Sequence, residues 1–150
     1  MANVTIRDAT DKDIPIILGL LYDLGRPKPH QDSDVDSFRK LVKNYIQDSD
    51  KKLLVAILDD VKIVGMISMM LLSRLNRDAL EMYIPELIVL GKHQGQGIGK
   101  KLITSCIAFA TEKKCHRIRL DSGNSRKESH EFYKHIGFEQ SSLSFTKNLS

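Results

Sequence analysis

The sequence predicts a single α/β domain in which a mixed central sheet of about six to seven strands has helices on both faces. Two observations indicate this class. Apolar segments of strand length dominate residues 52–90, and Asp59-Asp60 forms a hairpin turn between the first two. A helical pattern over 98–113 then leads to the alternating segment 117–121, and a crossover helix of this kind joins parallel strands.

Residues 4–45 are predicted to form one strand and two helices. Residues 4–7 alternate apolar and polar side chains, which is typical of a strand. Thr10 can cap the first helix with Asp13 as its capping-box partner, and Gly25 ends this helix. The polar loop 26–34 is long enough to cover a site, although a plain solvated connection is an equal alternative. The second helix has apolar residues at helical spacing: Phe38, Leu41, Val42 and Tyr45.

The middle of the chain contains predicted strands over 52–58, 62–72 and 80–90. Gly65 in the second of these indicates a bulge or a close backbone approach. The third is interrupted at Pro85-Glu86, where we expect a bulge or a splay. Beyond the crossover, a helix that stops at Gly137 and a last strand over 142–149 are predicted.

The composition is that of a soluble globular protein, with 41% hydrophobic and 28% charged residues. No apolar run is long enough to span a bilayer, and the N-terminal residues lack the apolar core of a signal peptide, so we expect a cytoplasmic protein without a membrane partner. The net charge is +4, but the cations are spread beside 19 acids, so no nucleic-acid partner is expected. Cys106 and Cys115 lack zinc-ligand spacing, and no metal site is expected.

The stretch from Gln94 to Lys100 is the most informative part of the sequence. It follows an apolar strand that ends at Leu90 and opens a helix at Ile98. Its three glycines allow a tight turn and a close approach to a ligand, and the free N–H groups of a helix's first turn attract anions. A phosphate or pyrophosphate is therefore the expected ligand, and a solvent-exposed turn with incidental glycines is the alternative.

Two familiar phosphate motifs do not fit this stretch. A dinucleotide-binding G-x-G-x-x-G would need glycine where Lys100 stands, and a Walker loop would need Ser or Thr where Lys101 stands. The pattern that remains is Gln-x-x-Gly-x-Gly, at Gln94, Gly97 and Gly99. It resembles the acyl-CoA loop of the GNAT family of N-acetyltransferases, which lies between a central strand and a helix.

A second pattern downstream strengthens this resemblance. Many relatives hold the pantetheine arm with an asparagine at the place of Arg126; the nearest asparagine here is Asn124, so both are candidates for that contact. The family's signature small-x-x-Phe-Tyr-x-x-x-Gly-Phe is matched by Ser129, Phe132, Tyr133, Gly137 and Phe138.

The resemblance implies a GNAT-like fold over residues 1–150 and acetyl-CoA as a co-substrate. It also implies that backbone N–H groups of the central strand hold the pantetheine and the thioester carbonyl, and that the phenol of Tyr133 protonates the leaving sulfur. A core aromatic is the alternative role of Tyr133. The residues expected to bind the cofactor are Ile88, Val89, Leu90, Gln94, Gly95, Gln96, Gly97, Ile98, Gly99, Lys100, Asn124 and Arg126.

Glu86 is the candidate general base, because this acid directly follows the strand-breaking Pro85 and relatives often use an acid near this place through a water. A solvent-facing strand end is the alternative, and Glu81 is a second candidate base. We expect transfer of an acetyl group to a primary amine of a small molecule or peptide. The alternative function is a non-catalytic acyl-CoA-binding sensor or regulator. The resemblance also allows a homodimer, since dimers are common in this fold.

Overall fold

The computed structural model describes residues 3–150, which form two compact units, residues 3–119 and 120–150. The second unit contains the helix α4 (Lys127–His135). The first contains β1 (Val4–Asp8), the short 3-10 helix η1 (Asp11–Asp13), α1 (Ile14–Asp23), α2 (Asp32–Gln47), β2 (Lys51–Leu58), β3 (Lys62–Arg74), β4 (Arg77–Ile84), β5 (Leu87–Val89), the 3-10 helix η2 (Gly91–His93), α3 (Ile98–Glu112) and nearly all of β6 (Arg117–Leu120).

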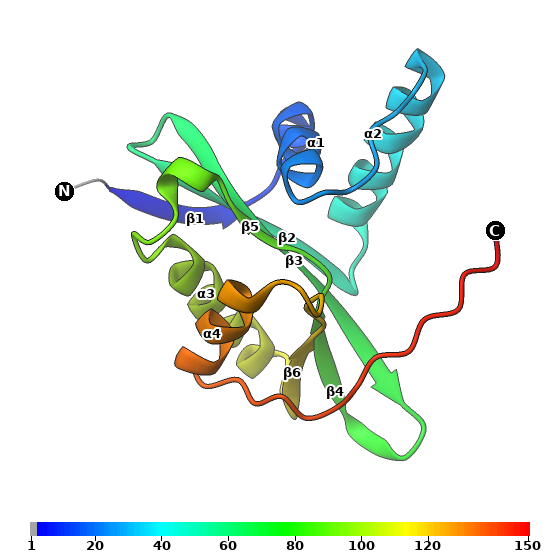
Figure 1. The fold of residues 1–150 in the computed structure, drawn as a ribbon, viewed down its shortest axis with the longest axis vertical. Helices are drawn as coiled ribbons and strands as arrows, with labels where there is room; N and C mark the ends of the chain where they lie inside the picture. The colour runs from blue at the N-terminus through cyan, green and yellow to red at the C-terminus, as the bar shows by residue number, and fades with distance from the viewer. Residues whose placement is uncertain (1–2) are drawn as a thin grey trace. The chain divides into compact units, whose positions relative to one another are not determined.

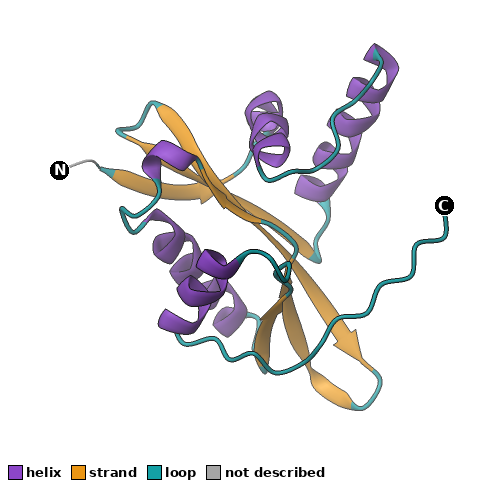
Figure 2. Ribbon diagram, in the orientation of Figure 1, coloured by secondary structure: helices purple, strands orange, loops and turns teal. Residues whose placement is uncertain are grey.

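One mixed sheet contains the six strands of the described chain (Figures 1 and 2). Its strand order is β1-β2-β3-β4-β6, and β5 pairs with β3 beside β4. The pairs β1–β2, β2–β3, β3–β4 and β3–β5 are antiparallel, so the parallel pair of this mixed sheet is β4–β6. The predicted fold class is confirmed.

Helices cover both faces of the sheet in the first unit. α1 and α2 pack against one face, and α3 packs against the other (Figure 1). Side chains alternate between the two faces of a strand, and on β3 Met66 and Ser68 lie on the α1 side, where they share a cavity with Ile17. On the other side, Leu102 and Cys106 of α3 are completely buried, as predicted for the crossover helix.

The predicted contact between Thr10 and Asp13 forms, but Thr10 caps the short helix η1, and Asp13 is itself the N-terminal cap of α1. The predicted hairpin turn at Asp59-Asp60 is confirmed. Thr10 N–H donates to Asp13 Oδ2 (2.8 Å), and Arg7 holds the same carboxylate at 2.7 Å. Asp59 and Asp60 have φ values of +52° and +61°. Left-handed conformations at both central residues define the type I′ turn that suits a two-residue hairpin loop.

The break at Pro85 is a one-residue bulge in the strand edge that faces β3. Met70 is opposite Tyr83, whereas Ile67 is opposite Leu87. Three steps along β3 therefore match four steps along β4 and β5. The extra residue bends the chain at Pro85-Glu86, as predicted.

Gly65 of β3 marks a close approach between two backbones. The register of β2 and β3 shifts beside it, between Ala56 and Ile57. A Cβ atom at Gly65 would lie 2.8 Å from the carbonyl oxygen of Ile88 on β5. Because real Cβ atoms do not come this close to a backbone oxygen, only glycine lets β5 sit at its observed place.

The second unit is built around α4. Gly137 has a φ of +99° and ends the helix, as predicted. The ring of Tyr133 makes edge contacts with Phe132 and Phe138, with centroids 5.4 and 5.8 Å apart.

The predicted last strand over 142–149 is wrong. This segment has no strand pairing in the described chain, and its apolar side chains are exposed: Leu143, Phe145 and Leu149. The apolar–polar alternation is present, but a strand needs a neighbouring backbone to bond its N–H and C=O groups. No helix within residues 3–150 has the length and apolar character to cross a bilayer.

Candidate active site

The glycine loop opens α3 as the sequence predicts. Gly95 and Gly97 have φ values of +77° and +82°, and Gly97 is the N-terminal cap of the helix. The first helical hydrogen bond runs from Lys101 N–H to Gly97 O (3.1 Å). The earlier N–H groups of Ile98, Gly99 and Lys100 have no partner inside the helix, because the first turn of any helix lacks them. They form a positive end suited to a phosphate.

The space around this loop fits a bound phosphate. A Cβ atom placed on Gly95 or Gly97 would meet no protein atom within 4 Å, so the loop faces open space. Gln94 Nε2 donates to Val89 O (3.0 Å), which fixes the start of the loop on β5. Gln96 and Lys100 are exposed beside it.

One edge of β5 is hydrogen-bonded to the backbone of β3. Leu90 N–H donates to Val64 O, and Ser68 N–H donates to Glu86 O, both at 2.9 Å. Bonding residues alternate along an antiparallel strand, so Ile88 also faces β3 and Val89 directs its N–H away from it. Three amides were expected to hold the pantetheine. Those of Ile88 and Leu90 face β3 within the sheet, so only the N–H group of Val89 is directed away from β3 and could bond the pantetheine.

Glu86 lies in the bulge and is held by two partners. Its Oε1 accepts a hydrogen bond from Ser68 Oγ (2.5 Å), and its own N–H donates to the same hydroxyl oxygen (2.8 Å). Its Oε2 forms an ion pair with Arg26 Nη2 (3.0 Å), and Arg26 also donates to Pro85 O (3.2 Å). The side chain is 21% exposed, so the carboxylate is oriented but still reachable.

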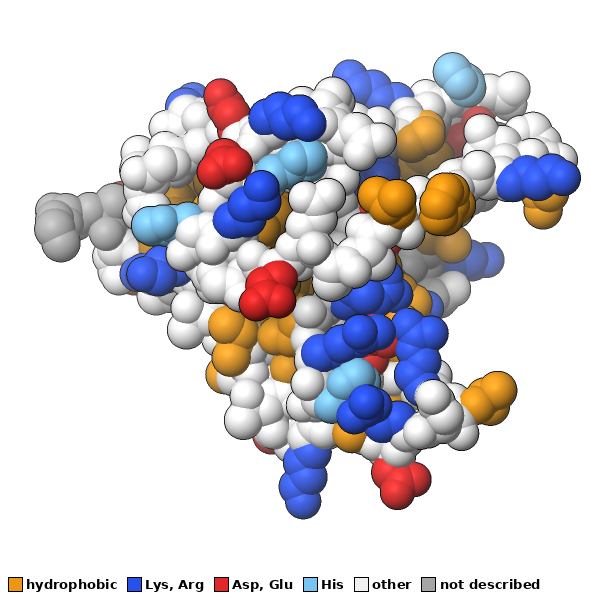
Figure 3. Space-filling model, turned by 60° about the horizontal axis from the view of Figure 1, so that its bottom comes forward, with side chains coloured by type: hydrophobic (Ala, Val, Ile, Leu, Met, Phe, Trp, Pro, Cys, Tyr) orange, Lys and Arg blue, Asp and Glu red, His pale blue; other side chains and the backbone are white. Residues whose placement is uncertain are grey.

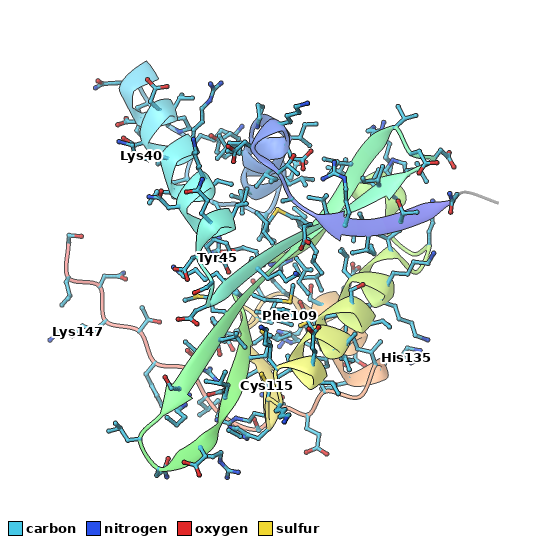
Figure 4. The ribbon with its side chains drawn as sticks, turned by 180° about the vertical axis from the view of Figure 1, so that it is seen from behind. Lys40, Tyr45, Phe109, Cys115, His135 and Lys147 are labelled. Atoms are coloured by element: carbon cyan, nitrogen blue, oxygen red, sulfur yellow. The ribbon has the colours of Figure 1, made fainter. Side chains whose placement is uncertain are left out.

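An apolar cavity of about 140 Å³ lies between the α1–α2 layer and the sheet. Tyr45, near the C-terminal end of α2 in Figure 4, lines it and donates from its hydroxyl to Met69 O (2.8 Å). Burial raises the pKa of Tyr45 well above its usual value, so this phenol stays neutral. Ser68 and Glu86 contribute polar groups to the cavity, whose other lining residues are Ile17, Leu21, Leu41, Val42, Leu53 and Met66.

Glu81, the second candidate base, is excluded by its surroundings. It is completely buried and contacts Arg74, Arg117 and Arg119. Burial alone would raise the pKa of this carboxyl, but hydrogen bonds from Arg119 and Arg74 hold it at about 2. Both of its oxygens are occupied by guanidinium donors, and a carboxylate with so low a pKa is a weak base.

The remaining predicted residues lie in the second unit. Burial raises the pKa of the Tyr133 phenol, against an opposing effect of Arg126, so the hydroxyl is protonated at neutral pH. Arg126 caps α4, and its N–H bonds Gly123 O (3.0 Å). Asn124 lies in the turn just before it.

Three residues around Glu86 were not predicted: Arg26, Ser68 and Tyr45. Arg26 belongs to the polar loop 26–34, for which a covering role was one alternative. Ser68 is a hydroxyl residue flanked by apolar residues in the middle of strand β3, and that was the one signal available. Tyr45 fits the apolar helical pattern of an ordinary core residue, so the sequence carried no signal for it.

The comparison with family models agrees with this arrangement. The model of the acetyltransferase (GNAT) family matches residues 18–138, which include the glycine loop, Glu86 and Tyr133. The chain belongs to the GNAT family. The resemblance noted in the two sequence motifs is thereby confirmed.

Relatives of this GNAT chain include enzymes and a protein described as a regulator. An aminoalkylphosphonate N-acetyltransferase from Salmonella typhimurium is 28% identical, with 96% of this chain and 90% of the relative covered. The structure of a transcriptional regulator from Bacillus halodurans is 28% identical, with a TM-score of 0.89 and 98% and 100% coverage. An aminoglycoside N-acetyltransferase in complex with CoA has a TM-score of 0.84 at 18% identity, with 100% and 97% coverage, and shares the fold.

Proposed function

We propose that residues 1–150 act as one acetyl-CoA-dependent N-acetyltransferase domain whose acceptor is a primary amine of a small molecule or peptide. The observation that carries this proposal is the position of β5. Glu86 stands directly before this strand, and the glycine loop follows it after η2. The three-residue strand β5 therefore lies between the Glu86 carboxylate and the glycine loop at the start of α3, where the proposal places the phosphates of acetyl-CoA.

The glycine loop would hold the pyrophosphate on the N–H groups of Gln96 to Lys100, and Val89 N–H would donate to the pantetheine or the thioester carbonyl. Acetyl-CoA supplies the acetyl group as a thioester. Asn124 and Arg126 remain candidates for further contacts with the pantetheine arm and the phosphates. Ile88 supports the site from within the sheet, because it is buried on β5.

Glu86 would accept the proton of the acceptor, directly or through a water. A primary ammonium has a pKa of about 10 and no lone pair, so deprotonation must come before attack. The neutral amine nitrogen then bonds the carbonyl carbon, the carbon–sulfur bond breaks, and Tyr133 would donate its proton to the leaving sulfur. The second proton that the nitrogen loses would return to the phenolate, which leaves an amide, a free thiol and one proton on Glu86. Ser68 and Arg26 are positioning residues, because they orient the Glu86 carboxylate.

The names of the relatives support a small amine as the acceptor. One acts on aminoalkylphosphonates and another on aminoglycosides. The direct test is a panel of amines incubated with acetyl-CoA while free thiol is measured. Thiol release that depends on an amine supports the proposal, and its absence across diverse amines contradicts it.

Glu86→Gln is expected to lower turnover most at low pH and to leave acetyl-CoA affinity unchanged. Glutamine keeps the shape and one oxygen but cannot take up a proton, and the acceptor is most fully protonated at low pH. The measurement is a pH–rate profile of both proteins. Arg26→Gln is the matched control, since it breaks the same ion pair and keeps the carboxylate. If the profile of Glu86→Gln overlays that of the parent, another base or bulk water removes the proton.

Gly97→Val is expected to abolish most of the affinity for CoA, because a branched side chain would stand where the backbone approaches the pyrophosphate. Calorimetric titration with CoA measures this. Gly25→Val is the control: Gly25 has a similar φ of +97° and likewise no atom within 4 Å of an added Cβ, so it suffers the same backbone strain. Equal affinity in the folded Gly97→Val variant and the control would contradict the assignment of the loop.

A non-catalytic acyl-CoA-binding regulator is the second candidate. The Bacillus halodurans relative, described as a transcriptional regulator, favours it. Under this alternative the protein binds acetyl-CoA in the titration and releases no thiol with any amine.

A further inference from the structure

A basic cluster lies on the part of the sheet formed by β3, β4 and β6. The buried Glu81 accepts hydrogen bonds from Nε of Arg74 (2.8 Å), Arg117 (3.1 Å) and Arg119 (2.7 Å). Three guanidinium groups thus converge on one buried carboxylate. Figure 3 shows Lys and Arg side chains crowded in this part of the surface.

These arginines are still open to solvent. The exposed fractions of their side chains are 44% for Arg74, 52% for Arg117 and 30% for Arg119. The pKa of His116 reflects the local charge: burial lowers it, and Arg77 and Arg117 lower it further. A surface that presents several partly exposed guanidinium groups suits a phosphate or phosphonate, whose oxygens match the planar fork of arginine.

The cluster lies on the same face of the sheet as Glu86. Directly paired residues share a face, and β3 pairs Met70 with Tyr83 and Leu72 with Glu81. Ser68, which holds Glu86, is two residues from Met70 and therefore on that face as well. Leu72 lies four residue steps beyond Ser68 along β3, which is about 13 Å at the usual strand rise. The guanidinium of Arg119 lies over the ring of Tyr83 (4.8 Å), between these two places.

The phosphates of CoA do not explain the cluster. α3 has 15 residues and spans about 22 Å at the usual helical rise. The glycine loop opens its N-terminal end, whereas β6 with Arg117 follows its C-terminal end. An anion at the cluster is therefore a different group from the pyrophosphate at the loop.

We propose that this basic cluster binds the phosphate or phosphonate group of an acceptor whose amine reacts beside Glu86. The proposal rests on the proposed acetyltransferase function. The strand spacing sets the separation of amine and anion on the order of 10 Å. The acceptor class is therefore an extended amine with a terminal oxyanion.

The test compares two acceptors that differ only in the distal group, aminohexanol and aminohexyl phosphate. We expect the phosphate ester to have a kcat/KM at least tenfold higher, through a lower KM. Arg117→Gln should reduce the ratio of the two kcat/KM values about tenfold. Arg77→Gln should also reduce this ratio. Arg77 is not one of the three arginines shown above to bond Glu81, so this variant tests the proposal even if Arg117→Gln fails to fold. Arg39→Gln, on the exposed side of α2, is the control that leaves the ratio unchanged.

A binding measurement separates this proposal from the proposed function. Arginine side-chain NMR signals are followed while each acceptor, or inorganic phosphate, is added. Shifts with aminohexyl phosphate that are absent with aminohexanol support the subsite even if neither compound is acetylated. Equal kcat/KM values for two acetylated acceptors overturn the subsite and leave the enzyme. Shifts with inorganic phosphate that aminohexyl phosphate does not reproduce also overturn it, because the site then binds a free anion only.

Discussion

Glu81→Gln is expected to lower the free energy of unfolding by about 3 kcal/mol, the lower end of the range for breaking a buried ion pair. The carboxylate is completely buried, and its loss leaves three guanidinium groups without their shared counter-ion. The cost is at the lower end because Arg74 and Arg117 are about half exposed and can turn toward water. Urea denaturation at neutral pH measures the difference. Glu112→Gln, at the exposed end of α3, is the control and should change stability by less than about 0.5 kcal/mol.

The pH dependence gives an independent check on the same carboxylate. Its pKa is lowered from 4.5 to about 2 in the folded protein, so the ionised group stabilises the fold above pH 4.5. This contribution of about 3 kcal/mol is lost as the pH falls from 4.5 toward 2. The stability difference between the parent and Glu81→Gln should therefore shrink over that interval. A difference that is constant between pH 7 and pH 2.5 would contradict the role given to this ion cluster.

Tyr133→Phe is expected to lower turnover about 100-fold, at the lower end of the usual effect of general acid catalysis. The lower end is expected because a thiolate, with a pKa of about 8.5 for the thiol, is already a fair leaving group. The ring and its edge contacts with Phe132 and Phe138 remain, so only the proton donor is lost. Steady-state kinetics with a reactive amine, together with calorimetric titration of acetyl-CoA, separates turnover from binding.

Tyr22→Phe is the matched control, because it removes a phenol hydroxyl from α1 instead of α4. It should retain the turnover of the parent. If Tyr133→Phe is as active as the parent at neutral pH, Tyr133 is a packing residue. A loss of acetyl-CoA affinity in place of turnover would assign its hydroxyl to binding.

The parts that the sequence predicted correctly depend on neighbouring residues. The left-handed turn at Asp59-Asp60, the contact between Thr10 and Asp13 and the glycine loop each follow from a few adjacent side chains, whose conformational preferences act locally. The bulge at Pro85-Glu86 is also local, because proline cannot donate a ladder hydrogen bond.

The parts that could not be predicted depend on contacts between distant segments. Glu81 and Glu86 are both acids in one apolar stretch, and the sequence alone left both as candidate bases. Arginines from β3 and β6 exclude Glu81, whereas a serine from β3 and an arginine from the α1–α2 loop orient Glu86. The segment 142–149 has the alternation of a strand, but no pattern within it can supply the neighbouring strand that pairing requires.

The extra residue at the β4–β5 bulge also makes the site sensitive to chain length. In a continuous register with β4, Glu86 would stand opposite Ile67 and its carboxylate would point to the α3 side, away from Ser68 and Arg26. One added residue exchanges the two faces for everything that follows in β5. The side of the sheet on which Glu86 stands is therefore encoded by the number of residues between Tyr83 and Leu87. A single-residue deletion there would invert the site even if every side chain of the site were retained.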